Sequence, residues 1–250
     1  MSALFSSHIL KNRFNLVWQG LLDLLYPPHC LLCKVGLEEG CLCLACIRTF
    51  QPLAPPFCDR CGVQVGMESS VCAECAEGRV PSYDGSAALA YYSGAMRNAI
   101  HLLKYEERVA LAEPLGRLLT ELVQSSPAFK GIAFDAVVPV PLHSSRLRYR
   151  GFNQSERLGR VIAKGTGLAL EDKELLRLRA TRSQASLSGE KRRTNLKDAF
   201  GTRNENTFKG KTLLLVDDVL TTSTTVSECA RVLKGAGAKR VYVLALSRGG

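Results

Sequence analysis

Two adjacent carboxylates, Asp217 and Asp218, stand between an apolar run and a stretch rich in hydroxyl groups. The apolar run, residues 213–216, is three leucines and a valine, which is typical of a strand buried on both faces of a parallel sheet. The hydroxyl stretch is Thr221, Thr222, Ser223, Thr224 and Thr225. A turn that opens a helix offers free backbone N–H groups to a phosphate, while paired acids suit the cis hydroxyls of a ribose. The pattern predicts a site for a ribose 5-phosphate.

The same residues resemble the phosphoribosyl pyrophosphate (PRPP) motif of type I phosphoribosyltransferases, in which two acids precede a Thr-Thr-Gly-x-Thr loop. Ser223 stands where that motif has glycine, and its Cβ is expected to weaken rather than abolish phosphate binding. One alternative is a buried strand whose acids only cap a helix. A second alternative is a Walker B strand, which requires a P-loop followed by a helix. The candidate P-loop ends at residues 210–212, but Glu205 replaces its first glycine and a strand, not a helix, follows it.

Nine of the ten cysteines lie between residues 30 and 75, and eight of them form four C-x2-C pairs. This spacing predicts two successive four-cysteine zinc ribbons with a structural role. A disulfide framework is the alternative, and it would require a secretory context. Interleaved pairing or a single metal stays open. The predicted ligands are Cys30, Cys33, Cys43 and Cys46, followed by Cys58, Cys61, Cys72 and Cys75. Cys41 is a surplus thiol, His29 a conceivable substitute ligand, and Cys229 a small core residue.

Length and composition allow one α/β domain and a small module, since the 250 residues are 46% hydrophobic. No segment has the apolar length of a membrane span. Residues 1–25 carry apolar side chains at helical spacing, so we expect an amphipathic helix there rather than a signal peptide. Thiols spaced for metal, without an export signal, favour the cytoplasm.

The formal net charge of +10 is concentrated in the later part of the chain. Residues 81–250 hold 27 Lys and Arg against 16 Asp and Glu, and residues 140–200 hold 14 against 6. A surplus of this size fits pyrophosphate recognition and also a polyanion such as single-stranded DNA or RNA. A solvated basic face is the alternative, because aromatic side chains interleave with these cations only at Tyr149 and Phe152.

Strand and helix patterns alternate from residue 84 onward. We expect strands at 87–92, 135–141, 211–217 and 241–247, and helices at 96–104, 111–124, 153–164 and 225–233. Alternation of this kind predicts a mainly parallel sheet with right-handed crossovers and a site at the carboxyl edge of its strands. The predicted ranges are 1–29 for a helical lead-in, 30–78 for the double zinc ribbon and 84–250 for the large domain.

Three more stretches are expected near that edge. Residues 138–142, Val-Pro-Val-Pro-Leu, form a stiff loop that could present backbone N–H groups to a second anion. Arg146, Arg148 and Arg150 precede Asn153, a predicted N-cap. Residues 178–195 show no periodicity and are rich in cations, which favours a polar loop able to close over a substrate.

Taken together, the chain resembles the ComF family, the ComFC and GntX-like proteins with a double zinc ribbon ahead of a phosphoribosyltransferase domain. The resemblance rests on residues 21–28, the cysteine pairs, Leu-Lys-Tyr at 103–105, residues 138–142, Arg-Gly-Phe-Asn-Gln at 150–154, the loop at 184–200 and the PRPP motif. It implies an α/β type I phosphoribosyltransferase fold behind a small N-terminal double zinc ribbon.

The resemblance also implies a function. A cytoplasmic competence factor is expected, which binds Mg²⁺ and PRPP and acts on imported single-stranded DNA in natural transformation, with a helicase-like competence protein as a partner. A salvage-type phosphoribosyltransferase with an unidentified acceptor and a non-catalytic PRPP sensor are the alternatives. Asp217 and Asp218 would hold the ribose in a transferase reaction. The implied PRPP-binding residues are Thr221, Thr222, Ser223, Thr224, Thr225, Lys104, Arg150, Gln184 and Arg193.

Overall fold

The computed structural model describes residues 27–106, 108–180, 196, 198–204 and 206–249. The chain divides into two compact units, one ending at Arg48 and one beginning at Thr49. The first unit carries one four-cysteine cluster and the short helix α2 (Leu44–Arg48), and the second carries the other cluster with helix α3 (Ala73–Ala76) and the whole sheet. The helix expected over residues 1–25 lies outside the described residues.

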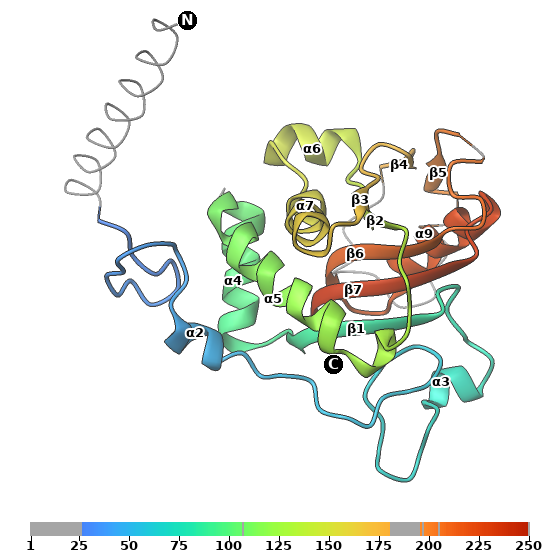
Figure 1. Cartoon of the computed structure of the whole chain (residues 1–250), viewed down its shortest axis with the longest axis horizontal. Coiled ribbons are helices and arrows are strands. Elements are labelled where there is room, and N and C mark those ends of the chain that lie inside the picture. The colour runs from blue at the N-terminus through green and yellow to red at the C-terminus, as the bar shows by residue number, and fades with distance from the viewer. Residues whose placement is uncertain (1–26, 107, 181–195, 197, 205, 250) are drawn as a thin grey trace, which may run out of the picture. The chain divides into compact units, whose positions relative to one another are not determined.

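A five-stranded parallel sheet forms the centre of the second unit (Figure 1). Its strands, in spatial order, are β1 (Gly85–Tyr91), β7 (Arg240–Arg248), β6 (Thr212–Leu220), β2 (Ala136–Pro139) and β3 (Ala169–Leu170). The parallel sheet, expected from the alternation of patterns, is confirmed. A separate antiparallel pair joins β4 (Leu175–Arg177) to β5 (Phe200–Thr202), and the sequence patterns had not indicated it.

Helices cover both faces of the sheet. Helix α5 packs on β1 and β7, and α7 packs on β2 and β6, while α9 contacts β6 and β7 (Figure 1). Besides α3, the described helices of this unit are α4 (Gly94–Tyr105), α5 (Ala112–Ser125), α6 (Ser144–Arg150), α7 (Gln154–Thr166) and α9 (Thr224–Gly235), with 3-10 turns at Val109–Leu111 and Pro127–Phe129. All four helices predicted for the large domain are present, whereas α6 and the short helices α2 and α3 of the cysteine clusters were not predicted.

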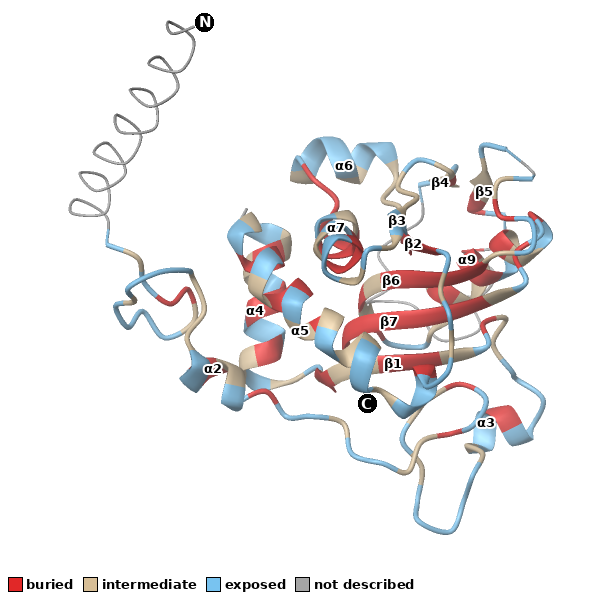
Figure 2. Ribbon diagram, in the orientation of Figure 1, coloured by how far each residue is buried: buried red, intermediate tan, exposed pale blue. Residues whose placement is uncertain are grey.

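The central strands are buried as the apolar run predicted (Figure 2). Residues 213–216 are all fully inaccessible to solvent, and each such leucine contributes about 2 kcal/mol of hydrophobic stabilisation. Leu213 and Leu215 share one core cluster with Cys229, which confirms the small core role of that thiol. Strand β6 continues to Leu220, so the two acids lie inside the strand rather than after it. Hydrogen bonds to β7 extend the strand, and this pairing is a tertiary effect.

Candidate functional site

The two acids of β6 have different partners. Asp218 is 4% exposed, and its Oδ2 lies 2.7 Å from Nζ of Lys104, which is on the last turn of α4. Asp217 Oδ1 accepts a hydrogen bond from Ser155 Oγ at 3.0 Å and another from the Asp218 backbone N–H at 2.9 Å. Ser155 belongs to the first turn of α7, so three elements meet at the acid pair.

Burial and the neighbouring charge act on these groups in opposite ways. Burial, followed by the charge of Asp218, raises the pKa of Asp217 to about 7, although Lys104 and the two hydrogen bonds act to lower it. Burial disfavours the charged form of Lys104 and so acts to lower its pKa. The attraction of the Asp218 carboxylate outweighs this effect, and the pKa of Lys104 is raised. The Lys104 ammonium therefore partly neutralises a pair of carboxylates that repel each other.

The hydroxyl stretch forms the turn between β6 and α9. Ser223 immediately precedes α9 and has φ 54°, ψ 7°, in the left-handed region that glycine adopts without strain. This backbone conformation gives a physical reason for the glycine in the resembling motif. Oγ1 of Thr222 and Oγ1 of Thr224 lie 2.8 Å apart, so the two hydroxyls are already arranged around one turn. Helix α9 begins at this turn, and the first backbone N–H groups of a helix have no intrahelical partner.

Arginines surround the acid pair in a cavity of about 340 Å³. Arg150 donates from Nη1 to Gln154 Oε1 at 2.6 Å, and its guanidinium lies 5.1 Å from the centroid of the Tyr105 ring. Arg177 comes from β4 and stacks over Phe200, with Cζ 5.3 Å from the ring centroid. Burial, and then the charge of Arg146, lowers the pKa of Arg177. These arginines repel one another, and an anionic ligand bound among them would offset that repulsion.

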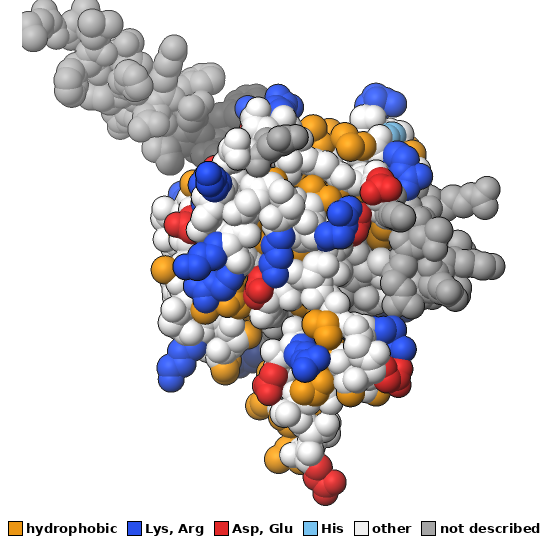
Figure 3. Space-filling view, turned by 90° about the vertical axis from the view of Figure 1, so that its right-hand side faces the viewer, with side chains coloured by type: hydrophobic (Ala, Val, Ile, Leu, Met, Phe, Trp, Pro, Cys, Tyr) orange, Lys and Arg blue, Asp and Glu red, His pale blue; other side chains and the backbone are white. Residues whose placement is uncertain are grey.

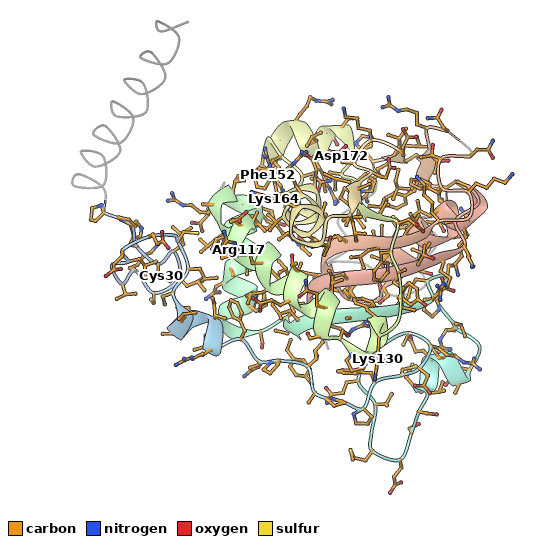
Figure 4. The ribbon with its side chains drawn as sticks, in the orientation of Figure 1. Cys30, Arg117, Lys130, Phe152, Lys164 and Asp172 are labelled. Carbon is orange, nitrogen blue, oxygen red and sulfur yellow. The ribbon has the colours of Figure 1, made fainter. Side chains whose placement is uncertain are left out.

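The Arg-Gly-Phe-Asn-Gln motif at residues 150–154 connects Arg150 of the cavity to the Val-Pro-Val-Pro-Leu stretch at residues 138–142. Gly151 ends α6 with φ 77°, and Asn153 caps α7 by accepting from the Ser155 N–H at 3.1 Å, which confirms the predicted N-cap. The Asn153 side chain also donates to the Val140 carbonyl at 3.0 Å. Phe152 is only 7% exposed and lies between α6 and α7 (Figure 4), so it is unavailable to stack on a base.

The predicted site residues fall into three groups. Six line the 340 Å³ cavity: Asp217, Asp218, Thr221, Thr225, Lys104 and Arg150. Three line an adjoining cavity of about 1230 Å³: Thr222, Ser223 and Thr224, and Thr221 lines both cavities. Two, Gln184 and Arg193, lie outside the described residues. The structure thus brings six predicted residues from four stretches of the chain to one cavity.

Sequence reasoning missed three contributors to this cavity: Ser155, Arg177 and Arg146. Arg146 was noted as one of a series of cations, and nothing distinguished it from its neighbours. Arg177 lies on a three-residue strand whose pairing depends on residues about 25 positions later, so no local pattern marks it. Ser155 lies in the first turn of α7, two residues after the N-cap Asn153. Its place at the start of a helix beside the predicted sheet edge is the signal that could have identified it.

The eight C-x2-C cysteines form two groups, and the ligand sulfurs of each group lie within 4.8 Å of one another. Sγ atoms are 3.7 Å apart for Cys30 and Cys46 and 3.6 Å apart for Cys61 and Cys72. Tetrahedral zinc with bonds of about 2.3 Å requires sulfurs roughly 3.8 Å apart, so both groups fit the metal. Consecutive pairing, rather than interleaving, follows. Cys30 is labelled in Figure 4 within the first cluster, and Cys41 belongs to neither.

One thiol in each cluster has a lowered pKa, which favours the thiolate form. Burial alone would raise the pKa of Cys58, but backbone hydrogen bonds from Cys72, Cys61 and Arg60 bring it to about 6, and Cys30 behaves in the same way. In contrast, burial and hydrogen bonding to other cluster thiols raise the pKa of Cys75. Because the thiolate is the form that binds zinc, the low-pKa thiol offers the first ligand.

Comparison with known proteins agrees with this architecture. A family model described as a double zinc ribbon domain matches residues 21–76, and one described as a phosphoribosyl transferase domain matches residues 113–249. The protein is therefore a type I phosphoribosyltransferase-fold protein that carries a double zinc ribbon. The chain belongs to the ComF family, whose members are linked by name to competence and DNA utilization.

Three relatives cover nearly all of the chain. The DNA utilization protein YhgH of Salmonella typhi is 35% identical, over 89% of this chain and 97% of that protein. Competence protein F of Haemophilus influenzae is 28% identical over 88% and 96%, and competence protein ComFC of Streptococcus pneumoniae is 28% identical over 84% and 89%. Among solved structures, the glutamine PRPP amidotransferase of B. subtilis superposes on 59% of this chain and 30% of its own length, with a TM-score of 0.40 and 20% identity.

Proposed function

We propose that the 340 Å³ cavity binds PRPP together with Mg²⁺. The observation that carries this proposal is the convergence of the acid pair, Lys104 and a serine-threonine turn at the start of α9. A turn before a helix suits the 5-phosphate, and paired carboxylates suit the ribose hydroxyls. Arg150, Arg146 and Arg177 line the same cavity and supply positive charge for the pyrophosphate group.

Each residue then has a distinct task. Asp217 and Asp218 would accept hydrogen bonds from the two ribose hydroxyls and help to hold Mg²⁺, which would neutralise charge on the pyrophosphate. Thr221, Thr222, Ser223, Thr224 and Thr225 surround the 5-phosphate. Lys104 pairs with Asp218 and lines the cavity, so its charge would be shared between this carboxylate and the pyrophosphate. Gln184 and Arg193 are proposed to contribute from outside the described residues.

Calorimetric titration with PRPP and Mg²⁺ tests this proposal. Saturable binding is expected for the native chain, and loss of at least a hundredfold in affinity is expected for the Asp217→Asn, Asp218→Asn variant. Asp172→Asn is the control, because Asp172 pairs with Arg160 on α7 and does not line the cavity. Undetectable PRPP binding by the native chain, or equal affinity in the double variant, contradicts the proposal.

We further propose that the protein is a cytoplasmic competence factor that handles imported single-stranded DNA. Helix α6 favours this role, because none of its residues is buried and it presents arginines beside the PRPP cavity. Tyr149 is 89% exposed and Leu147 is 41% exposed on this helix, so an aromatic ring stands free for base stacking among cations. On the face viewed in Figure 3, basic side chains are instead interspersed with acids.

Strand binding can be measured by fluorescence anisotropy with a labelled oligothymidylate at several salt concentrations. Arg148→Gln is expected to weaken binding and to lower the salt dependence by about one released counterion, and Tyr149→Ala is expected to weaken it at all salt concentrations. Arg117→Gln is the control, since Arg117 is an exposed arginine of α5 paired with Glu113. If all three variants bind as the native chain does, α6 is not the nucleic-acid surface. A helicase-like competence protein remains the proposed partner.

Phosphoribosyl transfer to an unidentified acceptor is a second candidate function. The observation that favours it over PRPP sensing is the 1230 Å³ cavity, which meets the PRPP cavity at Thr221 and leaves room for an acceptor. Pyrophosphate release on adding candidate acceptors tests this role. Binding of PRPP without release with any acceptor class would favour a sensor. Among the described residues no helix has the length and apolar character required to cross a membrane.

A further inference from the structure

The second cysteine cluster is tied to the PRPP turn through one backbone atom. Cys61 is a predicted zinc ligand through its Sγ atom. Its backbone carbonyl oxygen accepts hydrogen bonds from Ser86 Oγ at 2.7 Å, Tyr83 OH at 3.2 Å and Arg248 Nη2 at 3.3 Å. These donors are 22 to 187 residues away in sequence, and all three are buried. A carbonyl with three buried donors is a rigid junction between the cluster and the sheet.

Two of these donors reach onward to the turn. Tyr83 also lines the 1230 Å³ cavity together with Ser223, the left-handed residue that precedes α9; burial raises the pKa of Tyr83, and the Ser223 side chain acts to lower it. Arg248 ends β7, and the next residue, Gly249, donates its backbone N–H to the carbonyl of Leu220 at 2.8 Å, where the turn begins. Through Tyr83 and the chain after Arg248, the Cys61 carbonyl is thus linked to the middle of residues 221–225, at Ser223, and to Leu220 just before them.

Charge gives a second reason for this arrangement. Arg248 is 5% exposed and, within the part of the chain that the structure describes, forms no ion pair with a carboxylate. Zinc held by four thiolates would carry a net charge of −2, so a zinc-loaded cluster would supply negative charge near Arg248, whose Nη2 donates to the Cys61 carbonyl. Cys61 and Cys75 belong to the same core cluster as Leu220 of β6 and Val226 of α9, and they line one cavity with Ser223 and Thr224.

Close packing at the cluster leaves little freedom for this junction. Gly62 has φ 69°, and a Cβ there would lie 2.5 Å from the backbone oxygen of Ser86. The backbone of the cluster therefore touches β1 with no intervening side chain. Any rearrangement of the Cys58 to Cys61 turn must displace the Cys61 carbonyl and its three donors together.

We propose that the second zinc site positions the phosphate-binding turn, through the Cys61 carbonyl, Tyr83 and Arg248, and that the first zinc site does not. Zinc removal at the second cluster releases the carbonyl, and the turn loses the contacts that hold it at Ser223 and Leu220. Tyr83 and Arg248 are positioning residues, since they act on the ligand through the turn. This inference rests on the proposed function only for its PRPP readout.

Two matched cysteine variants test the difference between the clusters. Cys72→Ser removes the third ligand of the second cluster, and Cys43→Ser removes the equivalent ligand of the first, and both thiols are partly exposed. Hydrogen exchange at the Gly249 and Ser227 amides, which donate to the Leu220 and Ser223 carbonyls, reports the turn without any ligand. Zinc content per chain and the Kd for PRPP with Mg²⁺ are measured on the same samples.

Each variant is expected to lose one zinc. In Cys72→Ser, exchange at the two amides is expected to rise at least tenfold and the Kd at least tenfold, and in Cys43→Ser both are expected to stay within twofold of the native values. Equal effects of the two variants, or a Cys72→Ser protein that loses zinc with native exchange, would overturn the proposal. If the native chain binds no PRPP, the proposed function fails, and the exchange comparison still decides this inference.

A second pair of variants leaves every cysteine in place, in case loss of a ligand unfolds the ribbon. Tyr83→Phe removes the bridging hydroxyl, whereas Tyr91→Phe removes a hydroxyl that links β1 to Gln64 of the same ribbon without touching the turn. With both zincs retained, Tyr83→Phe is expected to raise exchange at Ser227 and to weaken PRPP three- to tenfold, and Tyr91→Phe to change neither. Native behaviour of Tyr83→Phe would overturn the role of the bridge.

Discussion

Replacing Asp217 with asparagine is expected to stabilise the fold while it removes ligand binding. The pKa of Asp217 is raised from its ordinary value of 3.8 to about 7 by burial and by Asp218. Because each pH unit corresponds to about 1.4 kcal/mol, this rise corresponds to at most about 4 kcal/mol of strain on the charged form. An asparagine Oδ1 still accepts from Ser155 Oγ and from the residue 218 N–H, so the hydrogen bonds survive.

The pH dependence follows from the sign of this shift. A carboxyl whose pKa is raised in the folded state contributes stability that is fully present below its unfolded pKa, near 4, and is lost as the pH rises through 7. The native chain should therefore lose stability between pH 5 and pH 8. Asp217→Asn should lose much less, and at pH 8 we expect it to be more stable by about 2 to 4 kcal/mol.

Urea denaturation at pH 5 and pH 8, with PRPP titration on the same samples, checks this prediction. Glu121→Gln, on an exposed position of α5, is the control and should follow the native chain at both pH values. The reasoning is refuted if Asp217→Asn is no more stable than the native chain at pH 8. It is equally refuted if the native chain keeps the same stability across this range.

The remaining predictions concern neighbouring contacts. Lys104→Met leaves Asp218 buried without its cation and should lower stability by about 3 kcal/mol at pH 8 and by less at pH 5, as measured by urea denaturation. Ser223→Val should cost about 2 kcal/mol, because a β-branched residue is strained at φ 54°, and Ser223→Gly less than about 1 kcal/mol; thermal denaturation of both variants checks this. Asn153→Ala removes the α7 cap and the donor to the Val140 carbonyl, and it should cost about 1 to 2 kcal/mol in the same assay. Elemental analysis should find two zinc ions per chain.

Local patterns predicted the elements that depend on local physics. A run of four apolar residues is typical of a strand that is covered on both faces, and residues 213–216 of β6 are buried accordingly. Asn153 was predicted as a cap because its short side chain reaches the N–H two residues on, a contact that needs no tertiary partner. The C-x2-C pairs bring their own thiolates together in the same way. In contrast, β4 and β5 are three residues each and pair across residues 178–199, so neither carries a pattern of its own.

The sequence by itself determined the chemical groups of this protein: the acid pair, the hydroxyl turn and two sets of four thiolates. Short-range geometry suffices for these, because their members are neighbours along the chain. Only the tertiary structure decided which long-range partner each group has. It paired Lys104 with Asp218, brought Arg177 to the acids and joined the Cys61 carbonyl to Arg248. These contacts depend on how the sheet, its helices and the second ribbon pack, and burial makes their electrostatics strong.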